Sequence, residues 1–599
     1  MIIDKEKLQT VLVTDCGSTT TKALLFEKTE KGWTNTQRGE APTTVEAPIA
    51  DVTKGALNAF TEIEEISKRK ILKENFENNP FLEKNNTNGI DLYLSTSSAG
   101  GGLQMLVAGV VKKMTTASAE RAALGAGAIV LDAFSCDDGY EDFERVERIR
   151  HLKPDIFLLA GGTDAGANNQ VIDFAETLLS ASPKPRFGKT LKLPVVYAGN
   201  QELKEDIKNI LKPISEVDFV PNILPNLGNE NLIPAREAIH ELFLSHVMSH
   251  SPGYDKLLSW SPVPILPTPS AVGLIVENFA KQTSQNVLCA DIGGATTDIF
   301  SVFKGSEDEP IYNRTVSANL GMSYSIANVF VSAGVEEIKK WLCYEISNLE
   351  IINRLRNKMI RPTSIPQTKE DLWLEQAVCR EALRLSLEHH ISLAVNLGGV
   401  KRKRSIGDIF TQNSKSDLLV DMLKLDVVIG SGGVLSHAPK RLESALMMID
   451  GFGLKGLTQI TVDSIFMLPH LGVFSTVHPE ASNEIFINDC LINVAHSIIP
   501  VYPKRNVKQK EILEVYIDNK KVGTVIKDKV KLLEDYANLK CRLSLKPLNS
   551  LVDIGNGQGK ILEKDVELGE FGLILDGRNN NLVTNTTLQQ EIYKELGIL

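Results

Sequence analysis

The sequence predicts a mixed α/β protein, and three observations support this fold class. The segments Val11–Lys22 and Asn286–Phe300 both run from an apolar strand through Asp-x-Gly and hydroxyl residues into a second strand. Between residues 103 and 200, apolar strands alternate with helices, which is typical of parallel βαβ units. Beyond about Tyr502, short strands and glycines follow one another, which favours a small β-rich accessory domain.

The N-terminal segment is predicted to form a strand, a loop and a second strand. The apolar runs "VLVTDCG" and "ALLFE" flank a row of small polar residues. A helix is expected at Asp51–Arg69 and another strand at Asp91–Thr96. The linker between them, "ENFENNPFLEKNNTNG", is polar and typical of a surface loop.

The alternating region has clear helix boundaries. The helix at 115–127 starts with threonines and ends at glycine, and two further helices are expected at Tyr140–His151 and Val171–Ser180. The strands are "LQMLVAGVV", "AIVLDAFS", "DIFLLAGG" and "LPVVYAGN". We interpret the glycines of "LLAGGTDAG" as a strand-to-helix turn rather than as a ligand loop.

The second half of the chain begins with a helix at Pro234–His250, which has proline in its first turn. A strand and loop start at Asn286, helices cover Lys369–Leu397, and a strand ending in glycines lies at Asp426–Gly433. The segment "EILEVYIDNKKVGTVIKD" predicts a hairpin in the β-rich tail.

Composition excludes several classes of protein. The formal net charge of −10 argues against a nucleic-acid binder. The seven cysteines are widely spaced, and no two of them form a C-x-x-C motif, so neither a zinc module nor a dithiol site is indicated. No uncharged apolar run approaches the length of a membrane span, and the charged N-terminus does not resemble a signal peptide. We expect a soluble cytoplasmic protein with no membrane partner.

The two strand–loop segments have the chemistry of phosphate sites. Asp15 and Asp291 take equivalent places in the two segments. Lys22 stands seven residues after Asp15, and Asp298 stands seven residues after Asp291. Glycines let backbone N–H groups approach phosphate oxygens, hydroxyls add donors, and Lys22 supplies positive charge. Two aspartates across a cleft can hold Mg²⁺ largely through its waters. We therefore expect ATP or ADP with Mg²⁺, and Asp15 and Asp291 as the metal-binding residues.

A third loop completes the pattern. The segment 426–439, "DVVIGSGGVLSHAP", is a strand that ends in glycines before a helix. Gly432 and Gly433 would let a flat adenine ring lie against the backbone.

The three loops together resemble the ATPase superfamily of actin, the large heat-shock chaperones and the sugar kinases. That resemblance covers about Leu8–Thr96 and Asn286–Gly453, and it implies a duplicated ribonuclease-H-like (actin-like ATPase) fold. The implied nucleotide-binding residues are Asp15, Gly17, Ser18, Thr19, Thr20 and Lys22 in the first loop, Asp291, Gly293, Gly294, Ala295, Thr296, Thr297 and Asp298 in the second, and Gly430, Ser431, Gly432 and Gly433 in the adenosine loop.

A closer resemblance is carried by six segments in order: "TDCGSTTTKALLF", "LLAGGTDAG", "VVYAGN", "PAREAI", "LPTPSAV" and "MLPHLGVFS". Together they resemble the glutamate mutase accessory family called GlmL or MutL, which is unrelated to the mismatch-repair protein of that name. The resemblance implies an accessory protein that uses ATP to reactivate or chaperone an adenosylcobalamin-dependent mutase. Whether the chain forms a homo-oligomer stays open.

These patterns predict four domains. We expect the first half of the ATPase core at 1–102 and an inserted Rossmann-like α/β subdomain at 103–225. A helical connection and the second ribonuclease-H-like half, with the adenosine loop, are expected at 226–500, and a β-rich accessory domain at 501–599.

The sequence departs from the chaperone pattern at the residue that orients the attacking water. Leu266 stands where chaperone ATPases carry a carboxylate or an amide, just before Pro267 and Thr268. Water positioning needs a hydrogen-bonding group, so Asp298 and Thr268 are the candidate catalytic residues. We expect slow hydrolysis.

Three alternative functions remain. A small-molecule kinase of the sugar or acid type would use Asp298 or Asp164 as its base. An electron-transferring dehydratase activator would need clustered cysteines for an iron–sulfur cluster, which the sequence lacks. A nucleotide-regulated structural protein would bind ATP without hydrolysing it.

Three other features are given structural interpretations. The basic run at 401–404 is typical of a solvated loop. The glycines of "VDIGNGQGK" are typical of a turn. His470 and His478 have no acidic or thiol companions at a metal-ligand spacing.

Overall fold

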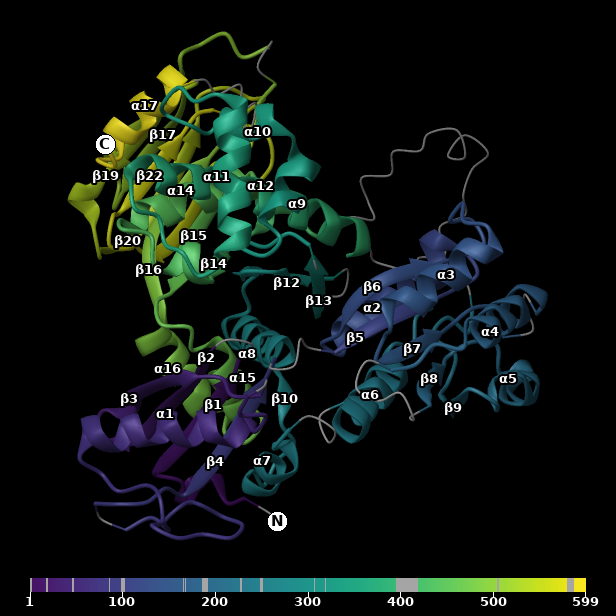
Figure 1. Ribbon diagram of the computed structural model, residues 1–599. Coiled ribbons are helices and arrows are strands. Elements are labelled where there is room, and N and C mark those ends of the chain that lie inside the picture. Colours follow the sequence, from purple (N-terminus) through teal and green to yellow (C-terminus); the bar gives the residue numbers. More distant parts are fainter. Residues whose placement is uncertain are drawn as a thin grey trace. The chain divides into compact units, whose positions relative to one another are not determined.

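The computed structural model of the chain is shown in Figure 1. It describes residues 3–17, 20–45, 48–85, 87–98, 103–164, 166, 168–185, 192–226, 229–247, 252–305, 308–317, 319–394, 419–503, 506–578 and 586–599. Ser18 and Thr19 of the first loop and the basic run at 401–404 lie outside these residues.

The chain divides into two compact units, each assembled from separate stretches of sequence. Unit 1 consists of Met1–Asn278, Val395–Asp417 and Leu468–Asp489, and unit 2 consists of Phe279–Ala394, Leu418–Met467 and Cys490–Leu599.

Unit 1 contains a five-stranded sheet in the order β10-β4-β1-β2-β3. β2 runs antiparallel to β1 and to β3, whereas β4 runs parallel to β1 and to β10. Helix α1 packs on β2 and β3 and begins at Asp51, whose carboxylate accepts the Thr53 N–H. The bounds are β1 Thr10–Cys16, β2 Thr20–Thr29, β3 Gly32–Pro42, α1 Val52–Ser67, β4 Leu92–Ser97 and β10 Leu266–Pro267.

Unit 2 contains an eight-stranded sheet in the order β13-β12-β11-β14-β15-β16-β22-β19. Its first five strands repeat the arrangement of unit 1: three antiparallel strands with β11 innermost, and β14 and β15 parallel to β11. The bounds are β11 Val287–Ile292, β12 Thr297–Lys304, β13 Pro310–Ser317, β14 Val427–Ser431, β15 Gly456–Asp463, β16 Leu491–Ile499, β19 Val530–Leu533 and β22 Leu573–Asp576.

This repetition confirms the duplicated ribonuclease-H-like fold that the sequence predicts. Within each set of five strands, the first strand of the half lies in the middle, its two hairpin partners lie on one side, and two parallel strands lie on the other. Apolar residues on both faces of β1 and β11 are buried, as expected for central strands that are covered on two sides.

The inserted α/β region of the predicted fold class is also confirmed. It forms a parallel sheet in the order β6-β5-β7-β8-β9. Helices α3, α4 and α5 pack side by side, and α2 packs against α6 (Figure 1). The bounds are β5 Gln104–Ala108, α2 Ala117–Gly125, β6 Ile129–Phe134, α3 Asp142–Leu152, β7 Ile156–Leu159, α4 Asn169–Ala181, β8 Leu193–Tyr197, α5 Lys204–Leu211, β9 Ser215–Phe219 and α6 Ile233–Leu242.

Unit 1 is completed by elements from distant parts of the sequence. Helix α7 lies at Tyr254–Trp260, and α15 and α16 lie at Leu468–Ser475 and Pro479–Ile485. Helix α8, Thr268–Thr283, belongs to unit 1 up to Asn278 and to unit 2 from Phe279. Helix α15 packs closely on α8, since a Cβ on Gly472 would come within 1.8 Å of the Ala271 carbonyl oxygen.

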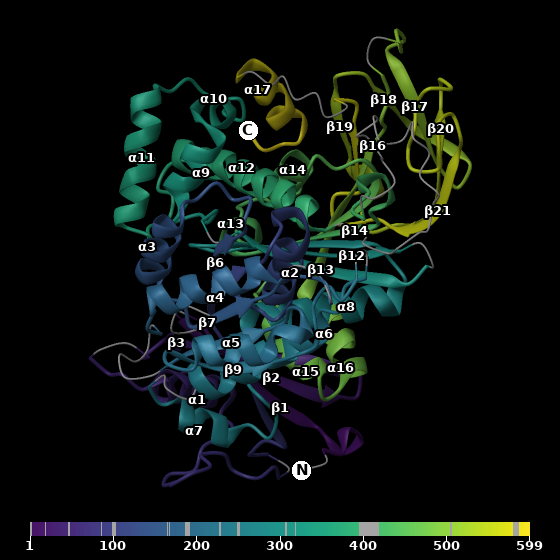
Figure 2. The same cartoon turned by 90° about the vertical axis from the view of Figure 1, so that its right-hand side faces the viewer.

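Unit 2 is covered by helices on the sheet and ends in a β-rich region (Figure 2). The helices are α9 Ile326–Ala333, α10 Val335–Lys339, α11 Asn348–Ile360, α12 Lys369–Leu393, α13 Gly433–Ser436, α14 Arg441–Phe452 and α17 Thr586–Glu595. A four-stranded sheet, β18-β17-β20-β21, confirms the β-rich tail, with β17 Glu511–Ile517, β18 Lys520–Ile526, β20 Lys540–Pro547 and β21 Leu562–Glu567. Among the described residues, no helix combines the length and apolar character that crossing a bilayer requires.

Candidate nucleotide site

The two predicted phosphate loops are closed by the same backbone hydrogen bond. The Gly17 N–H donates to the Thr20 carbonyl at 3.1 Å, and the Gly293 N–H donates to the Thr296 carbonyl at 2.8 Å. A Cβ on Gly17 would lie 2.7 Å from the Thr20 oxygen, so a side chain does not fit in this turn. The match extends to the detailed hydrogen bonding and is therefore evidence of duplication.

The two aspartates occupy the same place in their sheets. Asp15 is the last residue but one of β1, and Asp291 is the last residue but one of β11. The neighbouring hairpin strand places Lys22 directly opposite Asp15 and Asp298 directly opposite Asp291. Side chains of such cross-strand pairs lie on the same face of the sheet, so each loop pairs its aspartate with a different kind of charged residue.

The Asp15 carboxylate is held in place by two hydroxyl groups. Thr96 at the end of β4 donates to Oδ1 at 2.8 Å, and Thr268 donates to the same oxygen at 2.6 Å. Among the described residues, both hydrogen bonds to this carboxylate fall on Oδ1, so Oδ2 is available to a metal-bound water. Thr96 was not predicted from the sequence.

Thr268, a predicted catalytic residue, is the first residue of α8 and follows the short strand β10. Because its only hydroxyl proton is donated to Asp15, Thr268 acts here as a positioning residue for the aspartate. A direct part for Thr268 in water positioning stays a prediction.

Asp298, the other predicted catalytic residue, is buried in an ion pair. The Arg314 guanidinium donates to Asp298 Oδ1 from Nη2 at 2.6 Å and from Nε at 3.2 Å, and the Arg314 side chain has no exposed surface. Burial raises the pKa of Asp298, and the Arg314 charge opposes that rise. The side chain lies beside Asp291 but is fixed by Arg314.

The rest of the second loop is anchored by the segment that follows β13. The Gly294 carbonyl accepts the Ser323 N–H at 2.9 Å, and the Ala295 carbonyl accepts the Ser325 hydroxyl at 2.7 Å. The Thr297 hydroxyl donates to the Leu320 carbonyl. These contacts fix the loop backbone from one side.

The third loop has two glycines with different roles. Gly432 has φ +102°, and a Cβ there would lie 2.1 Å from the Ile292 carbonyl oxygen, so this glycine allows β14 to approach β11. A Cβ on Gly433 would meet nothing within 4 Å, so this position faces open space. Gly430 packs under the Met448 sulfur.

Asp463, which was not predicted from the sequence, and His470, which the sequence offered only as a rejected metal ligand, support these loops. Asp463, at the end of β15, accepts hydrogen bonds from the Ser431 hydroxyl at 3.3 Å and from the backbone N–H of Met467 at 3.2 Å. His470, buried on α15, lies 3.3 Å from the Lys22 carbonyl through Nε2. Burial lowers the pKa of His470 to about 4, so the imidazole is neutral at pH 7.

The donor set suits a weakly bound hydrated cation. Within the described part of the chain, no group of three or more His, Cys, Asp or Glu side chains is placed to hold a metal. Mg²⁺ commonly binds through one or two carboxylates, several waters and the phosphates of its nucleotide. Asp15, with Oδ1 fixed and Oδ2 available, fits this mode.

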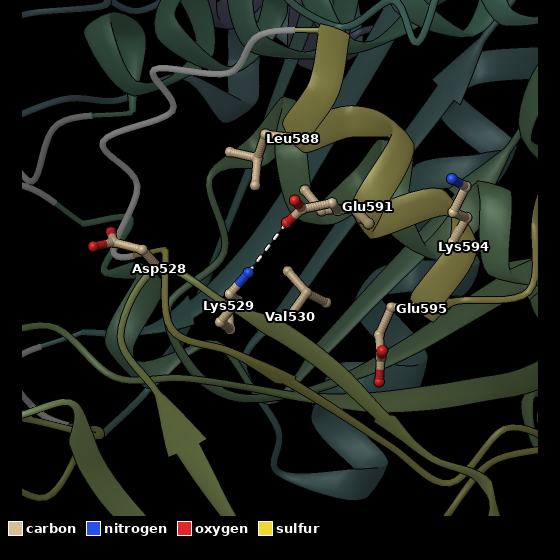
Figure 3. Close-up of a pocket in the computed structure, with 8 residues that line it drawn as sticks. Asp528, Lys529, Val530, Leu588, Glu591, Lys594 and Glu595 are labelled. Carbon is tan, nitrogen blue, oxygen red and sulfur yellow. Dashed lines mark hydrogen bonds and ion pairs between the residues drawn. The ribbon is translucent and has the colours of Figure 1, made fainter.

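A separate pocket of ≈ 360 Å³ lies between β19 and α17 (Figure 3). Glu591 points toward Lys529 and forms an ion pair with it at 3.1 Å, and Val530, Leu588 and Ile592 supply apolar lining. The pocket contains none of the predicted site residues.

Two sheets of one topology, each with an aspartate at the end of its central strand and a loop closed by the same hydrogen bond, define a protein of the actin-like ATPase and sugar-kinase fold class. The family described as "MutL protein" matches residues 11–490, and the chain belongs to this family. Protein MutL of Clostridium tetanomorphum is 29% identical over 497 residues, which cover 79% of this chain and 97% of that protein.

Similar solved structures include three proteins of low sequence identity. Nucleotide-free acetone carboxylase matches with a TM-score of 0.31 at 12% identity, and the match covers 78% of this chain and 70% of the carboxylase chain. Nucleotide-free diol dehydratase-reactivating factor matches with a TM-score of 0.30 at 10% identity, and the match covers 79% of this chain and 100% of the factor's chain. The activator of the 2-hydroxyisocaproyl-CoA dehydratase from Clostridium difficile, with bound ADPNP, matches with a TM-score of 0.27 at 9% identity. This match covers 80% of this chain and 97% of the activator's chain.

Proposed function

We propose that this protein binds Mg²⁺-ATP, hydrolyses it slowly, and uses the cycle to reactivate or chaperone an adenosylcobalamin-dependent mutase. The observation that carries the nucleotide part is the matched pair of strand-end aspartates, Asp15 and Asp291, on two loops with one hydrogen-bonding pattern. Membership of the MutL family supports the accessory role.

The chain's own groups suggest how the nucleotide would be held. Backbone N–H groups of the two glycine loops would donate to phosphate oxygens, and Lys22 would balance their charge. Asp15, fixed by Thr96 and Thr268, would receive the waters of the cation. The open space at Gly433 would receive the adenosine part. The bound Mg²⁺ would supply charge stabilisation for the phosphoryl group.

Slow turnover follows from the state of the candidate bases. Leu266 has no hydrogen-bonding group, the Thr268 hydroxyl proton is donated to Asp15, and Asp298 is paired with Arg314. None of these side chains holds an unengaged base of the kind that orients an attacking water. A slow ATPase suits a binding switch, because ATP binding alone can shift a two-state protein when it favours one state.

The kinase alternative has less support. Its second candidate base, Asp164, accepts the Asn222 amide at 2.9 Å and the Gln201 N–H at 3.2 Å through Oδ1. These two hydrogen bonds hold Oδ1 of the Asp164 carboxylate against other residues of the inserted subdomain.

The test is calorimetry with ATP and ADP, with and without Mg²⁺, followed by phosphate release in the presence of a mutase carrying inactivated cobalamin. We expect Mg²⁺-dependent binding, low basal turnover and stimulation by the mutase together with cobalamin release. Absence of binding heat for both nucleotides would refute the nucleotide site. Binding without any effect of ATP on cobalamin release would refute the chaperone role alone.

A further inference from the structure

The chain returns from the inserted subdomain directly beside the first phosphate loop. Tyr254 is the first residue of α7, the helix that follows the inserted subdomain and packs against α1 (Figure 2). Ser97 is the last residue of β4, and the next strand along the chain is β5 of the inserted subdomain. The Tyr254 hydroxyl forms a hydrogen bond with the Ser97 hydroxyl, and both residues are buried. This contact therefore joins the segment that leads to the inserted subdomain with the segment that returns from it.

The Ser97 hydroxyl holds the peptide group at which the loop begins. Ser97 Oγ donates to the Cys16 carbonyl at 3.1 Å, and the Ser98 N–H donates to the same oxygen at 3.0 Å. The Cys16 carbonyl and the Gly17 N–H belong to one planar peptide group. Because that N–H closes the loop on the Thr20 carbonyl at 3.1 Å, anchoring the carbonyl fixes the plane of the first peptide of the loop.

Tyr254 sets the direction of the Ser97 hydroxyl. A serine hydroxyl has one proton to donate and can accept a hydrogen bond at the same time. The Ser97 proton goes to the Cys16 carbonyl, so the Tyr254 phenol is the donor in the contact between the two hydroxyls. Burial raises the pKa of Tyr254 well above its usual range, so the phenol keeps this proton at pH 7. Without the phenol, the Ser97 side chain is freer to rotate away from the carbonyl.

The segment before Tyr254 is held against the start of α1. The Pro252 carbonyl accepts the Val52 N–H at 3.0 Å. Gly253 has φ +82°, and a Cβ there would lie 2.2 Å from Asp51 Oδ1, so glycine allows this close approach. The Tyr254 ring then enters the hydrophobic core of unit 1. The position of the tyrosine hydroxyl is therefore set by the segment that returns from the inserted subdomain.

The duplicated half of the fold does not repeat this contact. The residue that pairs with the strand-end aspartate is followed by Ser97 in β4 and by Gly432 in β14. Glycine has no side chain, so the serine anchor cannot form there. The pair of Tyr254 and Ser97 is therefore tied to the half that carries the inserted subdomain, and it is not part of the loop architecture that the two halves share.

We propose that Tyr254 is a positioning residue of the first phosphate loop, acting through Ser97, and that it couples the inserted subdomain to phosphate binding. The proposal rests on the nucleotide part of the proposed function. Coupling between two sites is reciprocal. ATP that orders the loop would therefore tighten the contact at Tyr254, and a shift of the returning segment would loosen the loop.

The experiment measures binding of ATP, ADP and adenosine to the full-length protein by calorimetry in the presence of Mg²⁺. Tyr254→Phe removes the phenol hydroxyl and keeps the ring in the core. The affinity for ATP and ADP should fall about three- to tenfold, the range for loss of one hydrogen bond. The affinity for adenosine should stay unchanged, because adenosine has no phosphate.

Tyr197→Phe is the matched control. It removes the hydroxyl of another buried tyrosine, which donates to the Asn200 carbonyl at 2.8 Å within the inserted subdomain. This hydroxyl has no part in the contact with Ser97, so the variant should bind all three ligands like wild type.

A double-mutant cycle tests the route through Ser97. Ser97→Ala should weaken ATP binding at least as much as Tyr254→Phe. The double variant should bind like Ser97→Ala alone, because Tyr254 acts through that hydroxyl. Hydrogen exchange gives a second readout, which tests the coupling. Saturating ATP should slow amide exchange across α7 in wild type and leave it unchanged in Tyr254→Phe.

The outcomes separate this inference from the proposed function. Absence of ATP binding to wild type would refute both. Wild-type ATP affinity in Tyr254→Phe, or an equal loss of affinity for adenosine, would refute the positioning role and leave the nucleotide site standing. Additive losses in the double variant would refute the route through Ser97. Exchange across α7 that ATP does not change in wild type would refute the coupling to the inserted subdomain.

Discussion

At the scale of single residues, the Asp15 carboxylate shows how a site depends on groups far away in sequence. Its two hydroxyl donors, Thr96 and Thr268, lie 81 and 253 residues further along the chain than Asp15. Sequence patterns identify Asp15 because the loop around it is local. They do not identify Thr96, since only the pairing of β1 with β4 brings it next to the aspartate.

Thr268→Val tests the positioning of Asp15. The change removes one hydrogen bond to a carboxylate and keeps the shape, a loss of about 1.5–3 kcal/mol for a charged acceptor. We expect Mg²⁺-dependent ATP affinity to fall about tenfold or more, measured by calorimetry. Thr283→Val on the same helix removes only a hydroxyl contact to the Phe279 carbonyl and should leave the affinity unchanged. Equal affinities for both variants would contradict the positioning role.

Asp298→Asn tests whether Asp298 serves hydrolysis. We expect ATP binding to persist and phosphate release to stop, because the variant loses the charge beside Asp291 while the loops remain in place. The buried Arg314 then lacks its counter-charge, and breaking such a pair costs about 3–5 kcal/mol of stability. Melting temperature must therefore be recorded with turnover. A folded variant with normal turnover would assign Asp298 a purely structural role.

At the scale of elements, the strands and their loops could be predicted, and several helices could not. The central strands are continuous apolar runs that end in glycine, so β1, β11 and β14 appear at the expected places. Helix α8 was missed because one proline precedes it and another stands in its first turn, in "LPTP", and prolines are typical of loops. Helix α17 was missed because it follows a polar segment. Register, such as Asp291 opposite Asp298, depends on the turn geometry.

The third loop permits a matched pair of glycine variants. Gly433→Val extends into open space and should reduce ATP affinity while the melting temperature stays close to wild type. Gly432→Ala places a Cβ against the Ile292 carbonyl at positive φ and should lower the free energy of unfolding by about 1–3 kcal/mol. Calorimetry and thermal unfolding distinguish the two. Wild-type ATP affinity in Gly433→Val would exclude the adenosine assignment.

At the scale of the whole molecule, three buried neutral histidines make stability sensitive to acid. Burial lowers the pKa of His390 to about 3 and those of His470 and His496 to about 4. In the unfolded chain these imidazoles bind protons near pH 6.5. The unfolded state therefore gains protons first as the pH falls, so stability is lost progressively from about pH 6.5 toward the folded-state pKa values.

His390→Gln tests this dependence. His390 contacts the Thr315 and Ser301 hydroxyls at 2.9 and 2.7 Å, and glutamine can replace one of these contacts without titrating. Each buried histidine should contribute a slope of about 1.4 kcal/mol per pH unit to the free energy of unfolding. Denaturant titrations between pH 7 and 5 should give a shallower slope for the variant. An unchanged slope would mean that the pKa of His390 is not lowered in the folded protein.

The division of unit 1 among three stretches of sequence has a consequence for synthesis on the ribosome. Phe474 stacks on Phe26 with ring centroids 5.6 Å apart, and Asp489 accepts hydrogen bonds from Thr34 and Asn35. When residue 278 leaves the exit tunnel, β2 and β3 still lack these partners, although domains generally fold from the N-terminus during translation. The first half must therefore remain incomplete, with apolar surface open to chaperones, until the segment ending at residue 489 has emerged.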